Sequence, residues 1–364
     1  ITRPEQILAS IPQAIQVMLD PSDCGPATIA MSQDVQGESF DYPEVFFEEK
    51  VHEIRRVHPD PSQINQAVEK IKNSKQPIII SGGGVLYSEA EQELSKFAKK
   101  HNIPVTSTVM GIGCMTKDDP YYISAVGALG EGSSNSLSKD TDLALAIGTK
   151  LADFTTGSWA NFENPNFKLV SVNTARYDTT KHLATPVISD AKVGLQKISE
   201  ALGDWKAPDD WYKRAIKEKN EWDAYVEKQS GPTNQEEPSY AHAVGAVYRN
   251  SDPSDIVVTA AGGLVGEVVQ VWKPKQLNTF ETEWGFSCMG YEISGALGIK
   301  MAKPDQDVVV FVGDGSYLLN NTDIYSSVIY DQKLIIIVCD NGGHMVINRL
   351  QLAKGGKEYI CNLR

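Results

Sequence analysis

The stretch that decides the fold is VVVFVGDGSYLLNNTDIYSSVIYDQKLIIIVCDNGG, residues 308–343. It holds two aliphatic runs, 308–312 and 334–339, and each ends abruptly in polar residues and glycines, GDGS after the first and DNGG after the second. The pattern predicts two strands joined by a helix over 321–331. If the two strands are parallel, the helix between them forms a crossover that is almost always right-handed. Both strands would then end at the same edge of the sheet. Ligands of open α/β sheets bind outside that edge.

The polar residues at the two strand ends form a candidate metal site. Asp314 and Asn341 each carry a hard side-chain oxygen, and the backbone carbonyl of Gly343 can supply a third. Mg²⁺ takes about six oxygen ligands and usually shares them with phosphate and water, so three protein oxygens suit it. Gly315 and Ser316 lead into a helix, where N–H groups and the hydroxyl can meet phosphate oxygens. Either motif alone could be an ordinary tight turn, but two such motifs after two strands favour a binding site.

The composition indicates a globular chain with more than one domain. At 364 residues the chain exceeds one ordinary core. The 34 basic and 47 acidic residues give a net charge of -13, which argues against nucleic acid and anionic membrane surfaces as partners. No apolar run approaches the roughly 20 residues that span a bilayer. An anionic cofactor would need a metal ion or backbone N–H groups to offset its charge.

The five cysteines favour neither disulfides nor structural zinc, because they are odd in number and show no C-x-x-C spacing. We expect Cys288 and Cys339 to be reduced packing residues of a cytoplasmic protein.

Hydrophobic periodicity divides the chain into α/β units. We interpret 1–47, with a helix over 4–19 and a strand over 27–31, as the tail of a domain that begins before Ile1. The predicted units that follow are a linker at 48–61, a central Rossmann-like domain at 62–203, an exposed connector at 204–239, and a second doubly wound, parallel-sheet domain at 240–364. Alternation of helix and strand in both large units predicts parallel sheets covered by helices. The predicted helices are 62–73, 88–101, 191–202, 240–250, 265–272 and 290–302, and the predicted strands are 77–81, 104–108, 142–147, 168–173 and 256–260.

GDG, followed some two dozen residues later by an Asn-containing turn, resembles the thiamine diphosphate motif of the acetolactate synthase and pyruvate decarboxylase superfamily. A P-loop is excluded because no G-K-[ST] is present. The resemblance implies that thiamine diphosphate and Mg²⁺ bind at this edge, with Asp314, Asn341 and Gly343 holding the metal. The cofactor-binding residues that it implies are Gly263, Leu264, Ser287, Met289, Gly315, Ser316 and Gly342.

Two of these residue groups carry further implications. By resemblance, Gly263 and Leu264 belong to a second turn that contacts the diphosphate, and the segment FSCMG holds the aminopyrimidine ring. In the family a bulky apolar residue wedges the cofactor into a V shape, and Met289 occupies that position. An unbranched thioether suits such a wedge, although Met289 could also be plain core. His344 lies close in sequence to the site, where we interpret it as loop filler rather than a substrate contact.

Longer stretches, among them EWGFSCMGYEISGALGIKMAKPDQDVVVFVGDGSYL and DNGGHMVINRLQ, resemble the ring-opening hydrolases of myo-inositol breakdown within this superfamily. That resemblance implies hydrolysis of a carbon–carbon bond in a cyclic, polyol-derived 1,2-diketone, yielding 5-deoxyglucuronate. Two alternatives stay open: a carboligase of the acetolactate synthase type, which shares the cofactor motifs, and a cofactor-binding relative without catalysis.

The family pattern has parts that this sequence does not show. A glutamate of the N-terminal pyrimidine-binding domain bonds N1′ of the cofactor, and we expect it upstream of Ile1, so no catalytic residue is assigned here. The stretch SYLLNN looks one residue short, and the chain ends where relatives continue, so we expect an incomplete chain. The glycine run at 82–84 lacks G-x-G-x-x-G spacing, and we do not expect FAD. The resemblance also implies self-association, with each site at a dimer interface.

Overall fold

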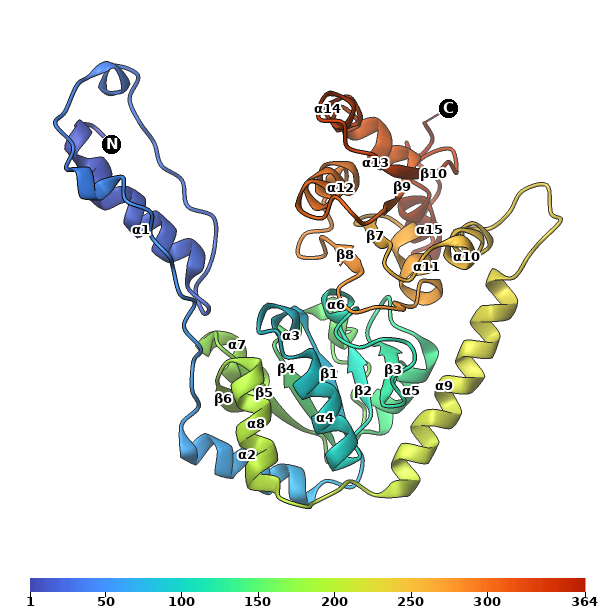
Figure 1. Cartoon of the computed structure of the whole chain (residues 1–364). Helices are drawn as coiled ribbons and strands as arrows, with labels where there is room; N and C mark the ends of the chain where they lie inside the picture. Colours follow the sequence, from blue (N-terminus) through green and yellow to red (C-terminus); the bar gives the residue numbers. More distant parts are fainter. Residues whose placement is uncertain (364) are drawn as a thin grey trace.

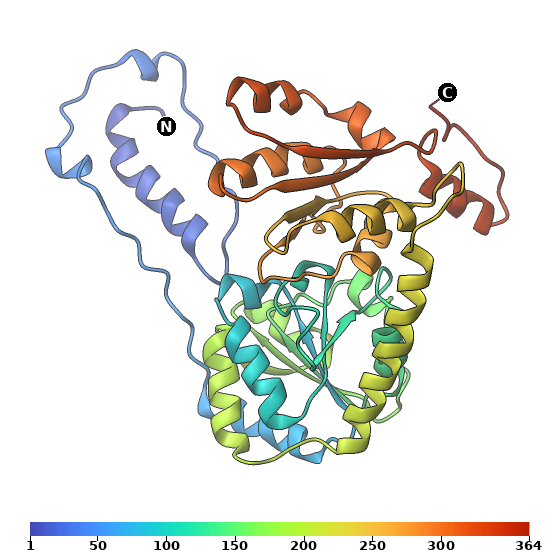
Figure 2. The ribbon, with the colours of Figure 1, turned by 45° about the vertical axis from the view of Figure 1, so that its right-hand side comes forward.

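The computed structural model describes residues 1–363, which form two α/β units joined by a long helix (Figures 1 and 2). The central unit is built on a six-stranded sheet of order β3-β2-β1-β4-β5-β6, and all its strand pairs are parallel. Its strands are β1 (Pro77–Ser81), β2 (Val105–Ser107), β3 (Tyr122–Ala125), β4 (Leu143–Ile147), β5 (Lys168–Asn173) and β6 (Thr185–Ile188). This is the doubly wound, Rossmann-type strand order, which confirms the predicted parallel sheet.

Both faces of the central sheet are buried. Side chains alternate along each strand, so neighbouring residues point to opposite faces. Ile79 of β1 faces one hydrophobic cluster, and Ile78 and Ile80 face another on the opposite side. Helices cover both clusters, as the continuous apolar strands predict. They are α2 (Pro61–Asn73), α3 (Gly83–Tyr87), α4 (Glu91–His101), α5 (Gly132–Asp140), α6 (Asp153–Thr156), α7 (Arg176–Thr180) and α8 (Ala191–Leu202). The predicted helix over 88–101 is present as α4, which starts three residues later, and the short helix α3 and the strands β3 and β6 were not predicted.

The glycine run after β1 has a structural role in the central unit. A Cβ on Gly82 would lie 2.3 Å from the carbonyl oxygen of Gly148, and a Cβ on Gly84 would lie 2.6 Å from the Cα of Gly148. Two loops therefore approach each other here at a distance that only glycine permits.

The connector is a long helix, α9 (Asp209–Ser230), that packs on both units, so the predicted exposure of this region is wrong in part. Trp211 is buried, and its indole N–H donates to the carbonyl of Pro77 at 2.8 Å. Trp222 packs against the core of the second unit, and its ring also lies against Gly132 of the central unit. The tryptophans are thus anchors of α9, which explains why this charged segment contains them.

The second unit has a four-stranded parallel sheet of order β10-β9-β7-β8. Its strands are β7 (Ile256–Thr259), β8 (Phe280–Thr282), β9 (Val308–Gly313) and β10 (Ile335–Cys339). Its helices are α10 (Tyr240–Asn250), α11 (Leu264–Val271), α12 (Tyr291–Ala302), α13 (Asp314–Leu319), α14 (Asp323–Ile329) and α15 (Met345–Ala353). The parallel pairing of β9 with β10 and the intervening α14 confirm the interpretation of residues 308–343. β8 and α15 were not predicted.

The first 47 residues stand away from both sheets (Figures 1 and 2). The predicted helix is present as a short turn, η1 (Pro4–Gln6), and α1 (Ile7–Leu19), and α1 has no buried residue. The predicted strand over 27–31 is wrong, because this segment is irregular and belongs to neither sheet. β-branched residues alone do not form a strand when no neighbouring strand accepts their hydrogen bonds.

The cysteines agree with the prediction in one case and contradict it in another. All five are unpaired, and Cys339 is buried in the core of the second unit. Cys288 is exposed, so it is not a packing residue. Within the part of the chain that the structure describes, no helix is long and apolar enough to cross a membrane.

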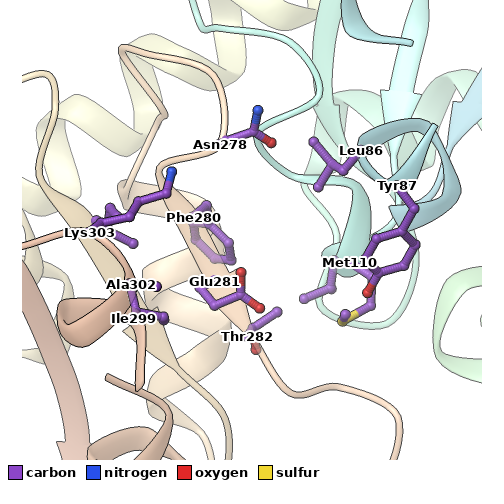
Figure 3. Close-up of a pocket in the computed structure, with 12 residues that line it drawn as sticks. Leu86, Tyr87, Met110, Asn278, Phe280, Glu281, Thr282, Ile299, Ala302 and Lys303 are labelled. Atoms are coloured by element: carbon purple, nitrogen blue, oxygen red, sulfur yellow. The ribbon is translucent and has the colours of Figure 1, made fainter. Parts of the chain in front are cut away.

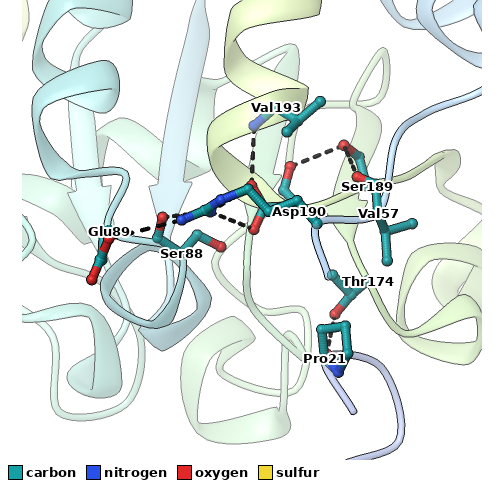
Figure 4. Close-up of polar contacts among 9 residues, drawn as sticks. Pro21, Val57, Ser88, Glu89, Thr174, Ser189, Asp190 and Val193 are labelled. Atoms are coloured by element: carbon teal, nitrogen blue, oxygen red, sulfur yellow. Dashed lines mark hydrogen bonds and ion pairs between the residues drawn. The ribbon is translucent and has the colours of Figure 1, made fainter. Parts of the chain in front are cut away.

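Arg56 attaches the N-terminal segment to the central unit (Figure 4). Its guanidinium donates to both carboxylate oxygens of Asp190, at 3.1 and 3.0 Å, and to the carbonyl of Ser88 at 2.7 Å. The Asp190 carboxylate also accepts from the backbone N–H of Val193 and so caps α8. The next residue, Val57, accepts the backbone N–H of Asp190 at 2.9 Å. Arg56 and Asp190 together therefore link the linker, the loop after α3 and the start of α8.

Replacement of Arg56 by alanine is expected to destabilise the central unit by about 1–2 kcal/mol, because it removes charge-assisted hydrogen bonds to a buried carboxylate. Arg55→Ala is the matched control, since Arg55 pairs with Asp20 through a side chain that is 79% exposed. Such exposed pairs contribute about 0–1 kcal/mol. Thermal unfolding of the two variants measures the difference, and equal midpoints would show that the Arg56–Asp190 contact does not hold the segment.

Candidate functional site

The loops after β9 and β10 begin side by side, as predicted. The last residues of the two strands, Gly313 and Cys339, are paired in register. The GDGS and DNGG segments therefore leave the same edge of the sheet from adjacent strands, which lie about 4.8 Å apart in a sheet. The turn after β7, at 260–263, leaves the same edge, because β7 pairs in parallel with β9.

Tyr240 holds the side chain of Asn341, one of the two proposed side-chain metal ligands. The side-chain amide of Asn341 donates to the Tyr240 hydroxyl, and its Oδ1 accepts from the backbone N–H of Gly343 at 3.2 Å. Burial raises the pKa of Tyr240, and the nearby charges of Cys339 and Asp314 add to this rise. Asp314 itself is only 9% exposed. The structure thus places Asp314 and Asn341 in segments that follow two adjacent strands, and Tyr240 fixes the direction of the Asn341 amide.

Gly343 occupies a position that only glycine can take. Its φ is +150°, and a Cβ would lie 2.1 Å from the carbonyl oxygen of Cys361. Residues near the end of the described chain fold back along this loop: the N–H of His344 donates to Cys361 at 2.7 Å, and the N–H of Leu363 donates to Gly342 at 2.9 Å. The carbonyl of Gly343 accepts from Met345 at 2.9 Å. A carbonyl oxygen has a second lone pair, which stays available for a metal ion.

Met289 and His344 lie over the GDG turn. A Cβ on Gly315 would be 2.7 Å from Cε1 of His344 and 3.4 Å from Cε of Met289. Gly315 and Ser316 begin the short helix α13, and both are buried. The Met289 side chain is 37% exposed, so it is a half-open apolar group beside the turn rather than plain core.

The remaining predicted cofactor residues lie on two neighbouring loops. Ser287 has φ +54°, and its hydroxyl donates to the carbonyl of Ala260 at 3.2 Å. Gly263 faces Val346, whose Cβ would be 3.7 Å from an added Cβ. Leu264 starts α11 with its side chain 3% exposed, so only its backbone could face a ligand.

Two glutamates that the sequence reasoning did not single out bind these loops. Glu283 accepts the backbone N–H groups of Phe286 at 2.9 Å and Cys288 at 2.7 Å. Although partial burial opposes it, these N–H groups lower the pKa of Glu283. Glu292 is completely buried and accepts the N–H groups of Ala261 and Gly290. The sequence offered one signal for Glu292, namely a glutamate in the first turn of the helix that follows Gly290. Acidic residues are common in the first turn of helices, so this signal did not distinguish Glu292.

The arrangement fits Mg²⁺ together with a phosphorylated ligand. Within residues 1–363, no three His, Cys, Asp or Glu side chains converge as a metal site. Asp314 is therefore the one charged oxygen in the proposed set, and amide, carbonyl and phosphate oxygens would complete it. Glycines 262, 313 and 342 have no protein atom within 4 Å of the position of an added Cβ, so the edge is open to a ligand.

A separate cavity of about 350 Å³ lies between the two units and not at this edge (Figure 3). Glu281 and Thr282 of β8 face Met110 and Tyr87 of the central unit across it. Burial raises the pKa of Glu281. The loops described above do not line this cavity, so we do not assign it to the same site.

Comparison with known proteins gives matches over most of the chain. The model of the thiamine pyrophosphate enzyme central domain matches residues 64–198, and that of the C-terminal TPP binding domain matches residues 260–363. Curated proteins named 3D-(3,5/4)-trihydroxycyclohexane-1,2-dione hydrolase are similar to the whole chain. The protein of Clostridium tetani is 37% identical over 388 residues, which cover 100% of this chain and 60% of the relative. The protein of Geobacillus thermodenitrificans is 36% identical over 388 residues, with the same coverage. The protein of Bacillus licheniformis is 36% identical over 390 residues, which cover 100% of this chain and 61% of the relative. The chain spans about 60% of the length of these relatives.

Replacement of Asp314 by alanine is expected to abolish the Mg²⁺-dependent binding of thiamine pyrophosphate, because it removes the only formal charge among the three proposed ligands. Isothermal titration with Mg²⁺ and with a chelator measures this binding. Asp305→Ala is the matched control, because Asp305 belongs to the turn before β9, at the opposite end of that strand. Unchanged affinity of the Asp314 variant would show that the metal binds elsewhere.

Proposed function

The chain belongs to the thiamine pyrophosphate enzymes, and from this premise we propose that it serves the hydrolysis of a carbon–carbon bond in 3D-(3,5/4)-trihydroxycyclohexane-1,2-dione. Addition of one water to this ring opens it to 5-deoxyglucuronate, the product that the sequence resemblance implies. The observation that carries the proposal is the convergence of the GDGS and DNGG loops at one sheet edge, with the Asn341 amide held by the Tyr240 hydroxyl. The choice of substrate is supported by the names of the similar proteins.

Each part of the site has a separate task in this proposal. When bound, thiamine pyrophosphate supplies a thiazolium carbon that adds to a carbonyl and accepts the electron pair of the bond that breaks. Asp314, Asn341 and the carbonyl of Gly343 hold Mg²⁺, which offsets the charge of the diphosphate in a chain whose net charge is -13. The N–H groups and hydroxyl at Gly315 and Ser316, at the start of α13, orient the phosphate oxygens.

The loop that contains Ser287 and Met289 orients the rings of the cofactor. Its backbone is held by Glu283 on one side and Glu292 on the other, so the polar backbone atoms near Ser287 have fixed directions. Met289 presents an apolar, half-exposed side chain towards the GDG turn. An apolar wedge at this place would exclude water from one side of the cofactor without requiring a hydrogen-bond partner.

A carboligase of the acetolactate synthase type is the second candidate function, because the same cofactor motifs serve both reactions. The two differ in the substrate that the pocket must accept. The cyclic dione carries several hydroxyls, so a pocket built for it needs polar partners, which a small methyl ketone would leave unpaired. A cofactor-binding protein without catalysis is distinguished by the same assay.

Incubated with thiamine pyrophosphate and Mg²⁺, the full-length enzyme is expected to consume the cyclic dione and to form little acetolactate from pyruvate. Each buried donor left unpaired by pyruvate costs about 1–3 kcal/mol, so a discrimination of at least about tenfold in kcat/KM is expected. Chromatography of the acid product measures both reactions, and Asp314→Ala serves as the inactive control. Efficient acetolactate formation would support the carboligase, and cofactor binding with neither reaction would support the non-catalytic alternative.

We also propose that the protein associates with a second copy through α13 and α14. These helices carry exposed apolar side chains at Leu318, Leu319, Tyr325, Val328 and Ile329. Adjacent large apolar groups of this kind commonly mark protein interfaces. The surface starts directly after Ser316, so a partner seated on it would lie beside the proposed cofactor site.

Tyr325→Asp is expected to weaken self-association, because it places a charge in an apolar interface. Sedimentation velocity over a range of concentrations measures the change. Tyr177→Asp is the matched control, since Tyr177 is a similarly exposed tyrosine of the central unit, 77% against 72%. A monomer at all concentrations, or equal effects of the two substitutions, would rule out this surface as the interface.

A further inference from the structure

Glu292 is a buried carboxylate without a cationic partner. It is the second residue of α12 and is 0% exposed. Within residues 1–363 it takes part in no ion pair shorter than 4.0 Å, in contrast to the buried Glu131, which pairs with Lys273. A charge placed in the interior without a counter-ion requires several hydrogen bonds to be tolerated.

The carboxylate of Glu292 accepts hydrogen bonds from two loops and lies close to a third segment. Its Oε1 accepts the N–H of Ala261, in the turn after β7, at 3.2 Å. Its Oε2 accepts the N–H of Gly290, at the end of the loop before α12, at 2.9 Å. The hydroxyl of Ser316, in the GDGS segment, interacts with the same carboxyl group. These segments are the proposed diphosphate turn, the proposed pyrimidine loop and the start of the proposed phosphate-binding helix.

We propose that Glu292 is a positioning residue that sets the spacing of the three cofactor loops relative to one another. This inference rests on the proposed cofactor site. Because one carboxylate accepts hydrogen bonds from two of these segments and interacts with the third, movement of one segment strains its contact with the others. The distance between the diphosphate turn and the pyrimidine loop is thereby set before a ligand arrives.

A carboxylate is the side chain that this junction requires. Both of its oxygens accept, so each can take an N–H from a different loop. Glutamine of the same shape has one oxygen and one NH₂ group, and that NH₂ would face the N–H of Ala261 or of Gly290. The start of α12 also favours a negative charge, since unpaired N–H groups gather there. Burial raises the pKa of Glu292, and the N–H groups of its own backbone, Gly290 and Ala261 oppose that rise.

Glu283 provides an internal comparison. It also accepts two backbone N–H groups, but both belong to the single segment 286–288. Its loss should disturb the pyrimidine loop alone. Glu281, two residues earlier, lines the cavity between the two units and binds none of the loops, so it is a matched control for the substitution of glutamate by glutamine.

The test compares Glu292→Gln, Glu283→Gln and Glu281→Gln in the otherwise intact chain, with two probes in the presence of Mg²⁺. Inorganic pyrophosphate reports on the diphosphate turn and on Ser316, and thiamine pyrophosphate reports on the pyrimidine loop as well. Glu292→Gln is expected to raise the Kd of both probes by about tenfold to a hundredfold, because one buried donor loses its acceptor. Glu283→Gln should raise only the Kd of thiamine pyrophosphate, and Glu281→Gln should change neither.

Hydrogen exchange provides a readout that does not need a cofactor. In the ligand-free Glu292→Gln protein, the amides of Ala261 and Gly290 should both exchange faster, whereas Glu283→Gln should affect only the segment 286–290. If Glu292→Gln does not fold, Glu292→Asp replaces it, since its charge is retained but its reach is shorter by one methylene. The variant should then lose protection at one of the two amides and lose affinity for both probes.

Two results would overturn the inference. One is unchanged affinity for pyrophosphate in the Glu292 variants, which would reduce Glu292 to the local role of Glu283. The other is unchanged exchange at both Ala261 and Gly290. The proposed function fails separately: if the unaltered chain bound neither probe, the cofactor site would be wrong, while the exchange measurement would still decide whether Glu292 couples the loops.

Discussion

The parallel pairing of β9 with β10 is the constraint on which the site depends. Five consecutive residue pairs, from Val309–Ile335 to Gly313–Cys339, fix the register of the two strands. β9 is also paired with β7 on its other side, and its five valine and phenylalanine residues are fully buried. Val309 and Phe311 pack in one core and the other three residues in a second core on the opposite face, so a slip of one residue would exchange the two sets between the faces. The positions of Asp314 and Asn341 depend on this register, because Asp314 directly follows the last residue of β9 and Asn341 is the second residue after β10.

This dependence explains which features could be predicted from the sequence. Long apolar strands such as β9 and β10, and long periodic helices such as α2 and α8, have signals within a single segment. The strands β3, β6 and β8 are three or four residues long, and they become strands only because a neighbour already offers its edge. The segment 27–31 shows the opposite case, with strand-forming residues and no neighbour. The adjacency of the segments that carry Asp314 and Asn341 was predictable from topology, whereas the contacts of Tyr240 and Glu292 join residues distant in sequence and required the structure.

Three buried carboxylates have three different kinds of interaction partner, and each kind suits a different role. Glu131 has Lys273 as a counter-ion, and this pair joins the central unit to the second unit. Burial raises the pKa of Glu131, and the charge of Lys273 opposes the rise. Glu292 has only neutral N–H and O–H donors, which suits a structural junction next to an anionic ligand, because a lysine there would compete with the metal for the phosphate. Asp314 accepts from the N–H of its neighbour Gly315 at 3.0 Å, which leaves oxygen lone pairs for a cation.

Because hydrogen bonds already fix the loops of the site, ligand binding costs little of their conformational entropy. The Asn341 amide is oriented by Tyr240 and by the N–H of Gly343, and the loop that precedes α12 is held from both ends by glutamates. Flexible loops would have to be ordered by the ligand, which costs about 0.5–1.5 kcal/mol for each immobilised side chain. The open positions at glycines 262, 313 and 342 are therefore not signs of looseness. They are the places where a rigid frame lacks side chains, so that phosphate oxygens and a metal ion can approach the backbone directly.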